Sequence, residues 1–234
     1  RAAWLPPMAA TLGCKETPHA LVLIHDRAQM AWPLPWLPMG GGDRVLVLDE
    51  SGSFGIAQVQ TSPAQALGLS AAGPAACEFT EWLEEGQTTP EAAAELRAAA
   101  RLWGATILTG IARASLDHAA TYVQERVSFG KPLSNHQGVA FIVAQMVMRV
   151  EGMDAQCMHA AWMAQSGQMD PCTDAWLECI EAGLYVTDNA VQLLGGHGYT
   201  RDHPVEKWMR DTRALTLLWG GPDLAMNDAA GREL

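Results

Sequence analysis

A glycine-rich turn near the end of the chain is the first candidate for chemistry. Three of the four residues from 195 to 198 are glycine, within the stretch QLLGGHGY (192–199), and the segments on both sides are predicted to be helices. Glycine costs about 1 kcal/mol relative to alanine inside a helix, so this stretch is expected to end one. The turn then either only caps the helix or leaves its backbone open to the close approach of another molecule.

Histidines on both sides of Tyr199 raise the question of a metal site. His197 and His203 are of a type that commonly binds zinc, but no third ligand stands at a useful spacing. The five cysteines are scattered without a CxxC pair, so neither a cysteine-rich zinc site nor a disulfide framework is indicated. No metal site is predicted, and both histidines are interpreted as turn residues.

The composition limits the possible partners. The 234 residues carry a formal net charge of −11, which argues against nucleic acid because binding phosphates requires a basic surface. No apolar run approaches the roughly 18 residues of a membrane span, so membrane insertion is not expected. The cysteine usage and the lack of a signal-peptide pattern favour a cytoplasmic protein. Only 18% of the residues are charged, so part of the surface is expected to be buried against other chains.

Residues 20–87 are predicted to form a small antiparallel β-domain. Glycine-containing turns such as MGGGD and ESGSF separate short runs of strand-forming residues. These runs are Ala20–Asp26, Arg44–Glu50, Phe54–Gln60 and Ala76–Leu83. A sheet of so few strands has edges that other elements must cover.

Residues 88–234 are predicted to form an antiparallel four-helix bundle. Thr89 and Pro90 supply an N-cap and a proline at the first helical position. Ser134 and Gln137 form a possible capping box for the second helix, and Gly220-Gly221-Pro222 is expected to end the fourth. The four helices are expected from Pro90 to about Phe129, from the capping box to Ser166, from Asp170 to Leu194 and from Pro204 to about Leu218.

Two segments together resemble the signature segments of the acyl-CoA dehydrogenase family. ERVSFGKPLSNHQ (125–137), between the first two expected helices, is similar to the family pattern Arg-x-x-Phe-Gly-x-Pro-Leu followed by a Gln. QLLGGHGYTRDHPVEKWMRD (192–211), between the last two, is similar to Gln-x-x-Gly-Gly-x-Gly-Tyr followed by Pro-Val-Glu and Arg-Asp. The resemblance covers roughly residues 88–221 and extends only loosely into the β-rich part.

The family fold implies an α+β protein. It consists of an N-terminal helical domain, a middle β-domain and a C-terminal four-helix bundle. The resemblance therefore implies that residues 1–19 are a remnant of a mostly missing first domain and a linker, that 20–87 form the middle β-domain, and that 88–234 form the bundle.

The resemblance also implies contact with FAD, mostly FAD held by a neighbouring subunit. Arg126 would pair with the pyrophosphate, a bidentate task that suits a guanidinium group. Ser128 and Gln137 would add hydrogen bonds, and Phe129 would pack beside the cofactor. Side-chain-free backbone would let the cofactor come within hydrogen-bond reach. The residues assigned to FAD are Arg126, Ser128, Phe129, Gln137, Gln192, Gly195 and Gly196.

The catalytic base of the family is missing from its expected places. Family members remove a proton next to the thioester with a carboxylate, and most place a Glu-Gly pair after the fourth helix. Counting from Arg210-Asp211, this pair falls on Trp219-Gly220, and indole cannot accept a proton at neutral pH. Some relatives carry the glutamate on the first bundle helix, at a position that falls near Ala100. Asp223 remains as a candidate for a displaced base.

These observations favour a subunit that supports catalysis without performing it. The chain would bind FAD and assemble, as a dimer or tetramer, with a homologous base-bearing subunit, as in members that act on steroid side chains. Acyl-CoA would be the substrate of the assembly. Two alternatives stay open: a flavin-free helical bundle used only for assembly, and a piece of a larger enzyme, because the sequence begins with Arg1 rather than Met.

Overall fold

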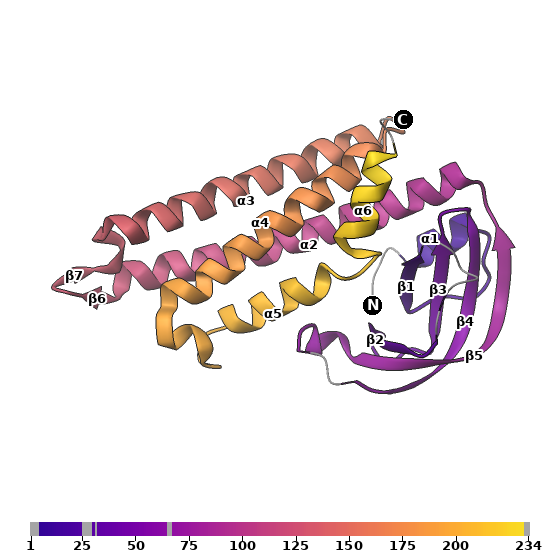
Figure 1. The fold of residues 1–234 in the computed structure, drawn as a ribbon, viewed down its shortest axis with the longest axis horizontal. Coiled ribbons are helices and arrows are strands. Elements are labelled where there is room, and N and C mark those ends of the chain that lie inside the picture. Colours follow the sequence, from indigo (N-terminus) through magenta and orange to yellow (C-terminus); the bar gives the residue numbers. More distant parts are fainter. Residues whose placement is uncertain (1–4, 25–29, 31, 65–66, 232–234) are drawn as a thin grey trace. The chain divides into compact units, whose positions relative to one another are not determined.

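The protein consists of two compact units. The computed structural model describes residues 5–24, 30, 32–64 and 67–231 of the chain (Figure 1). One unit comprises Arg1–Ala100 with Leu217–Leu224, and the other comprises Arg101–Thr216 with Ala225–Leu234. Residues 1–4 of the expected domain remnant, the expected strand end at 25–26 and the last three residues of the expected bundle lie outside the described residues.

A five-stranded sheet dominates the first unit. Its strands are β1 (Ala20–Ile24), β2 (Leu34–Pro38), β3 (Arg44–Asp49), β4 (Ser53–Pro63) and β5 (Pro74–Gln87). They lie in the order β1-β3-β4-β5-β2. The short helix α1 (Leu5–Thr11) precedes the sheet, and a 3-10 turn, η2 (Ser70–Ala72), lies between β4 and β5. Alternate residues of β3 and β4, among them Val45, Val47, Ala57 and Val59, form the buried core.

The α+β prediction is confirmed, with two differences in the sheet. Strand β2 was not predicted, because its sequence LPWLP contains two prolines. It lies at an edge of the sheet, where a strand tolerates proline. The sheet is also not purely antiparallel, because β1 pairs with β3 in parallel. In the sequence, β2 stands between β1 and β3, but in the sheet it lies at the edge opposite β1. The connection from β1 to β3 is therefore long enough for β3 to run in the same direction as β1.

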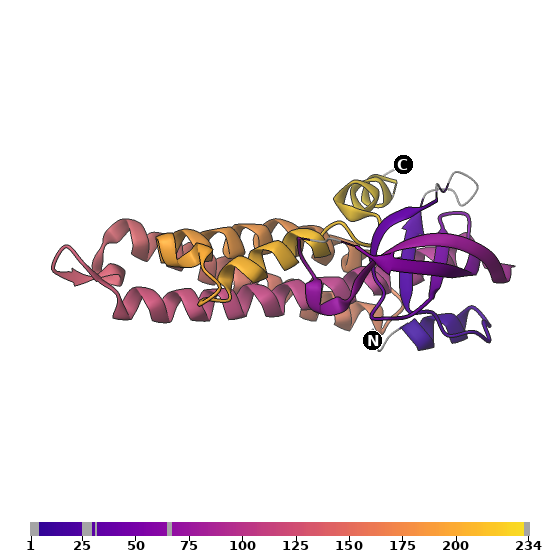
Figure 2. The same cartoon turned by 90° about the horizontal axis from the view of Figure 1, so that it is seen from below.

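Long antiparallel helices form the second unit. Helix α2 (Pro90–Glu125), of which the part after Ala100 belongs here, runs alongside α3 (Gln137–Ala164) and α4 (Asp170–Leu194) in both views (Figures 1 and 2). Helix α5 (Val205–Leu215) is the fourth member of the predicted bundle, and α6 (Gly221–Ala230) follows it. Leu108, Met146, Val150, Met153 and Trp176 are fully buried in this unit.

The helix starts and ends show which local signals were correct. The amide of Ala92 donates to the Thr89 hydroxyl at 3.2 Å, so the predicted N-cap of α2 is confirmed. The predicted capping box is wrong, because Ser134 lies in a 3-10 turn, η3 (Leu133–Asn135), and the N-cap of α3 is His136, without a side-chain cap bond. Helix α2 ends at Glu125, four residues before the expected end.

The end of the fourth helix also differs from the prediction. Helix α5 stops at Leu215 rather than near Leu218, and the glycines and Pro222 that were expected only to stop a helix begin α6 instead. Proline is tolerated in the first turn of a helix, so the same residues can end one helix and start the next.

Candidate cofactor-binding site

A tight hairpin follows α2 and carries the first signature segment. Strand β6 (Val127–Ser128) pairs with β7 (Lys131–Pro132), and the two turn residues, Phe129 and Gly130, have φ values of +51° and +80°. Positive φ at both positions is typical of a type I′ turn, which glycine adopts easily and a bulky residue does not. The Phe129 side chain is nevertheless 95% exposed. A strained, exposed aromatic residue contributes little to folding and is often a sign of function.

Arg126 is held by its backbone while its side chain remains available. Its amide donates to the Tyr122 carbonyl at 2.9 Å, and its carbonyl accepts from the Leu133 amide at 2.8 Å. The side chain is exposed, and no carboxylate among the described residues forms an ion pair with it. The guanidinium group is therefore placed beside the hairpin without a charge partner in this part of the chain.

His136 fixes the hairpin from the start of α3. Its Nε2 lies 3.1 Å from the Ser128 carbonyl, to which it donates, and its ring meets the Phe129 ring edge-on with centroids 6.3 Å apart. Ser128 is half-buried, and Gln137, the first residue of α3, is exposed. The sequence did not single out His136, although it directly precedes Gln137.

The structure itself explains two of the three glycines in the second signature segment. They lie in a 3-10 turn, η4 (Gly195–Tyr199), that follows α4. Gly195 has φ +57° and ψ −130°, a conformation that residues with side chains rarely adopt. A Cβ on Gly198 would lie 2.4 Å from the Val191 carbonyl oxygen, so packing requires glycine there.

Gly196 is glycine for no reason within the described structure. It has no positive φ, it is exposed, and a Cβ there would meet no atom within 4 Å. Gly195 is likewise exposed with open space at its Cβ position, and Gln192 is exposed on the last turn of α4. A helix cap alone explains Gly195 and packing explains Gly198, whereas Gly196 fits the close approach of another molecule.

A hydrogen bond joins the end of α2, just before the first signature segment, to the second signature segment. The Tyr122 hydroxyl lies 2.8 Å from Nδ1 of His197, and Tyr122 stands one helical turn before Arg126 on α2. His118, one turn earlier on α2, has its Nε2 3.0 Å from Nδ1 of His203. The last turns of α2 and the turn that precedes α5 therefore share one cluster of polar and aromatic side chains, formed by His118, Tyr122, His197 and His203.

Protonation of this cluster is disfavoured at His118. Burial lowers the pKa of His118, and the adjacent His203 lowers it further. Among the described residues, no group of three or more histidine, cysteine, aspartate or glutamate side chains is placed to hold a metal ion. His197 and His203 of the second segment form hydrogen bonds with Tyr122 and His118 of α2.

The other cations of the second segment are mostly paired. Arg210 forms an ion pair with Glu206 at 2.8 Å, and Lys207 forms one with Asp211. The signature residues Arg210 and Asp211 thus each pair with a residue one turn away along α5. Arg210 lowers the pKa of Glu206 through its hydrogen bond, so this carboxylate stays ionised. Arg210 and Lys207 are therefore already engaged by carboxylates of α5.

Comparison with known proteins identifies the family. Residues 91–234 match the family model of the acyl-CoA dehydrogenase C-terminal domain. The chain belongs to the acyl-CoA dehydrogenase family. FadE25 of Mycobacterium tuberculosis, which carries an acyl-CoA dehydrogenase name, is 38% identical over 128 residues that span 53% of this chain and 33% of that protein. The match thus spans about a third of the length of this relative.

Solved acyl-CoA dehydrogenases share the fold. Butyryl-CoA dehydrogenase from Megasphaera elsdenii matches with a TM-score of 0.70 and 23% identity, over 82% of this chain and 56% of that one. A structure described as the Tcur3481-Tcur3483 steroid ACAD G363A variant matches with a TM-score of 0.72 and 20% identity, over 92% of this chain and 62% of that one. Among the described residues, no helix is long and apolar enough to span a membrane.

The residues at the predicted positions of the catalytic base, and the candidate for a displaced base, lie in different surroundings. Trp219 is only 6% exposed and has φ +52°, and Gly220 and Gly221 continue the left-handed conformation. Ala100 on α2 is fully buried, and Asp223 is exposed in the first turn of α6. A buried indole thus occupies the position at which the resemblance predicts the catalytic glutamate.

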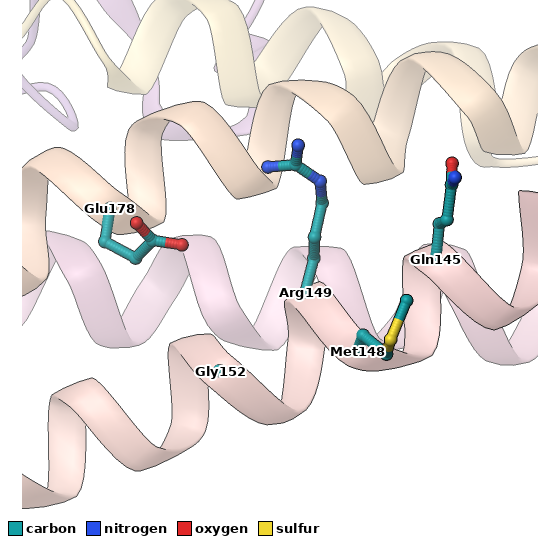
Figure 3. A pocket seen from close by; sticks show the side chains of 5 residues that line it. All are labelled: Gln145, Met148, Arg149, Gly152 and Glu178. Atoms are coloured by element: carbon teal, nitrogen blue, oxygen red, sulfur yellow. The ribbon is translucent and has the colours of Figure 1, made fainter.

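A shallow hollow between α3 and α4 is separate from both signature segments. It has a volume of about 430 Å³ and is lined by Gln145, Met148, Arg149, Gly152 and Glu178 (Figure 3). Arg149 pairs with Glu181 at 3.3 Å and lies over the Tyr185 ring, 4.4 Å from its centroid. Its guanidinium group is therefore already engaged, and none of the residues expected to bind FAD lines this hollow.

Proposed function

We propose that this chain is a flavin-contacting subunit of a heteromeric acyl-CoA dehydrogenase, in which another, homologous subunit supplies the catalytic base. The substrate of the assembly is an acyl-CoA thioester, which is oxidised between its α and β carbons with FAD as the hydride acceptor. The observation that carries the proposal is Gly196, whose backbone is exposed and open although neither its conformation nor its packing requires glycine.

Arg126 and Phe129 support contact with FAD beside Gly196. Arg126 lacks a charge partner among the described residues, and a guanidinium group binds a pyrophosphate through paired hydrogen bonds. Phe129 offers a flat apolar face that the strained turn keeps away from its own bundle. Ser128, Gln137, Gln192 and Gly195 add hydrogen-bonding groups. When bound, FAD supplies the hydride-accepting chemistry, and the residues of this chain bind and orient it.

An apolar face on α3 supports assembly with another subunit. Four large side chains lie within about a third of the helix circumference and are mostly exposed. They are Phe141 (59% exposed), Met148 (65%), Met158 (73%) and Trp162 (64%). Methionine adapts well to an irregular partner surface. The description of the Tcur3481-Tcur3483 relative, which names two components and a steroid, favours a homologous subunit as the occupant.

Trp219 argues against catalysis by this chain. General acid–base catalysis contributes about 10²–10⁴-fold in rate, and an indole cannot contribute it. The backbone amide of residue 219 can still donate a hydrogen bond to a carbonyl. We therefore place the proton-abstracting carboxylate on the partner subunit, and the proposed location of the assembly is the cytoplasm.

Flavin retention with and without a partner tests the proposal. The chain is purified alone and after co-expression with a base-bearing relative, and the flavin absorbance is measured after desalting. The proposal is supported if the co-purified assembly retains flavin and oxidises acyl-CoA, whereas the isolated chain does not oxidise acyl-CoA. A complex that contains no flavin would favour the flavin-free assembly protein, and acyl-CoA oxidation by the isolated chain would place the base here.

An Asp223→Asn variant tests whether Asp223, rather than the partner subunit, supplies the catalytic base. If the partner supplies the carboxylate, this variant retains the acyl-CoA oxidation rate of the wild-type assembly. A loss of about a hundredfold or more, with flavin content unchanged, would assign the base to Asp223. Asp174→Asn, which changes an exposed acid on α4, is the matched control.

A further inference from the structure

Two buried cysteines face each other between α3 and α4. The Sγ atoms of Cys157 and Cys179 lie 3.7 Å apart, and the two residues are 7% and 0% exposed. Thr109 of α2 brings its hydroxyl oxygen within 3.6 Å of each sulfur. This hydroxyl already donates to the Ala105 carbonyl at 2.9 Å, so it can only accept a hydrogen bond from a thiol.

The other buried cysteine of α4 has different surroundings. The sulfur of Cys172 lies 4.0 Å from the Ala160 carbonyl oxygen. Cys172 is as deeply buried as Cys179, so burial alone does not bring two sulfurs together in this bundle. Cys157 and Cys179 are 22 residues apart in the sequence, and the packing of α3 against α4 brings their sulfurs together.

We propose that Cys157 and Cys179 are a reversible redox modification site, which a peroxide converts into a disulfide that links α3 to α4. In the first step the Cys157 thiolate attacks a peroxide oxygen, the S–O bond forms, the O–O bond breaks and hydroxide leaves. In the second step the Cys179 sulfur attacks the sulfur of the Cys157 sulfenic acid, the S–S bond forms, the S–O bond breaks, and the hydroxyl leaves as water with the proton of the Cys179 thiol. In total, two thiols and one hydrogen peroxide give one disulfide and two water molecules.

The surroundings make Cys157 the sulfur that attacks first. The hydrogen bond with Cys179 lowers the pKa of the Cys157 thiol, and the same contact, with burial, raises the pKa of the Cys179 thiol. Cys157 is also the more exposed of the two, so a small oxidant reaches it first. Cys179 then acts as the resolving thiol from the opposite helix.

The movement that the bond requires is small. A disulfide has a sulfur–sulfur distance of about 2.05 Å, so the two atoms must approach by about 1.6 Å from their present separation. Rotation of the side chains about their Cα–Cβ bonds supplies movements of this size. The bond would close a loop that contains the connection between α3 and α4, which begins after Ala164 and ends before Asp170.

Mass spectrometry of the full chain tests the proposal. The protein is treated with hydrogen peroxide or with a reductant, unfolded, and labelled with N-ethylmaleimide. The five cysteines should give five adducts after reduction and three after oxidation. Non-reducing peptide mapping should find Cys157 linked to Cys179. Labelling of both thiols after oxidation, stable over-oxidation of Cys157, or a linkage between other cysteines would overturn the proposal.

Two variants assign the roles of the sulfurs. Cys179→Ser keeps a hydrogen-bond donor beside Cys157 but cannot form a disulfide, so it should stop the reaction at the Cys157 sulfenic acid, which dimedone traps. Cys172→Ala should form the disulfide as the wild type does. A Cys179→Ser protein without a dimedone adduct, while Cys157 remains a thiol, would contradict the proposed order.

The melting temperature provides a structural readout. Closing this loop should raise it by about 5–10 °C, and a reductant should reverse the rise. A lower melting temperature of the oxidised chain would contradict a bond that links α3 to α4 without distortion. Flavin content depends on other residues, so either outcome here leaves the proposed function to its own test.

Discussion

The Gly195–Tyr199 turn and the Trp219–Gly221 turn differ in how accessible their backbone is. The first is open: Gly195 and Gly196 are exposed, and a Cβ atom on Gly196 would meet nothing within 4 Å. The second is filled: Trp219 is buried, although its left-handed conformation is unfavourable for an aromatic residue. The two turns therefore differ in what they can admit: the backbone of the first is accessible to another molecule, as the proposed contact with FAD requires, whereas the indole fills the second, where the resemblance predicts the acid.

Removing the buried indole of Trp219 should cause the largest loss of stability among the variants compared. Trp219→Ala should lower the free energy of unfolding by about 3–5 kcal/mol, because it deletes a large buried side chain and leaves a cavity. Urea denaturation followed by circular dichroism measures this change. Leu217→Ala, at an exposed position two residues earlier, is the control and should change stability by less than about 0.5 kcal/mol. Equal effects of the two substitutions would mean that Trp219 does not fill this part of the protein.

Alanine substitutions at Gly196 and Gly198 should differ in their effect on stability, because only Gly198 is packed against the backbone of the chain. Gly198→Ala should cost about 1–3 kcal/mol, since its Cβ would lie 2.4 Å from the Val191 carbonyl oxygen. Gly196→Ala should leave the unfolding free energy nearly unchanged. Thermal denaturation of both variants checks the difference, and a larger loss for Gly196→Ala would remove the argument that nothing in the chain requires glycine there.

Arg126 should matter for flavin and not for folding. In the co-purified assembly, Arg126→Ala should weaken FAD binding by about tenfold to a hundredfold, the effect of losing a charged, bidentate hydrogen bond. Arg126→Lys should recover only part of this loss, because an ammonium group lacks the planar fork. Titration of the flavin-free assembly with FAD gives the affinities. Arg213→Ala, which removes an exposed cation that pairs with Asp188, is the control and should bind FAD as the wild type does.

The smallest expected effect is a dependence of stability on pH. Burial lowers the pKa of His118 in the folded state, so the unfolded chain takes up a proton more readily. Stability should therefore fall as the pH drops below the ordinary histidine value of 6.5, and this loss should level off below the folded pKa. Melting temperatures at several pH values measure it. His118→Gln should flatten the profile relative to the wild type, and His159→Gln, at an exposed position on α3, should not.

Local signals in the sequence were sufficient to predict most of the helix boundaries in the bundle. Thr89 and Pro90 marked the start of α2, and the glycine-rich turn marked the end of α4 at Leu194. They failed where one pattern has two meanings: Gly221 and Pro222 were interpreted only as a helix end, yet they begin α6. Strand β2 was missed because prolines usually exclude a strand, and only its position at the sheet edge accommodates them.

The contacts that build the candidate site could not be predicted from spacing. Tyr122 and His197 are 75 residues apart, and only the packing of the bundle brings them within 2.8 Å. The same holds for the sulfurs of Cys157 and Cys179, because the sequence showed only the absence of a local CxxC pair. The roles of the seven residues assigned to FAD stay a prediction, since they follow from the resemblance and from the open geometry of the two turns.

A bulky substitution at Gly196 tests the central claim most directly. Gly196→Leu should leave the melting temperature and the association with the partner unchanged, while the purified assembly loses its FAD. Gly110→Leu, at an exposed glycine of α2 with equally open surroundings, should retain FAD. If the Gly196→Leu assembly keeps FAD with the affinity of the wild type, the open turn does not contact the cofactor and the account is wrong.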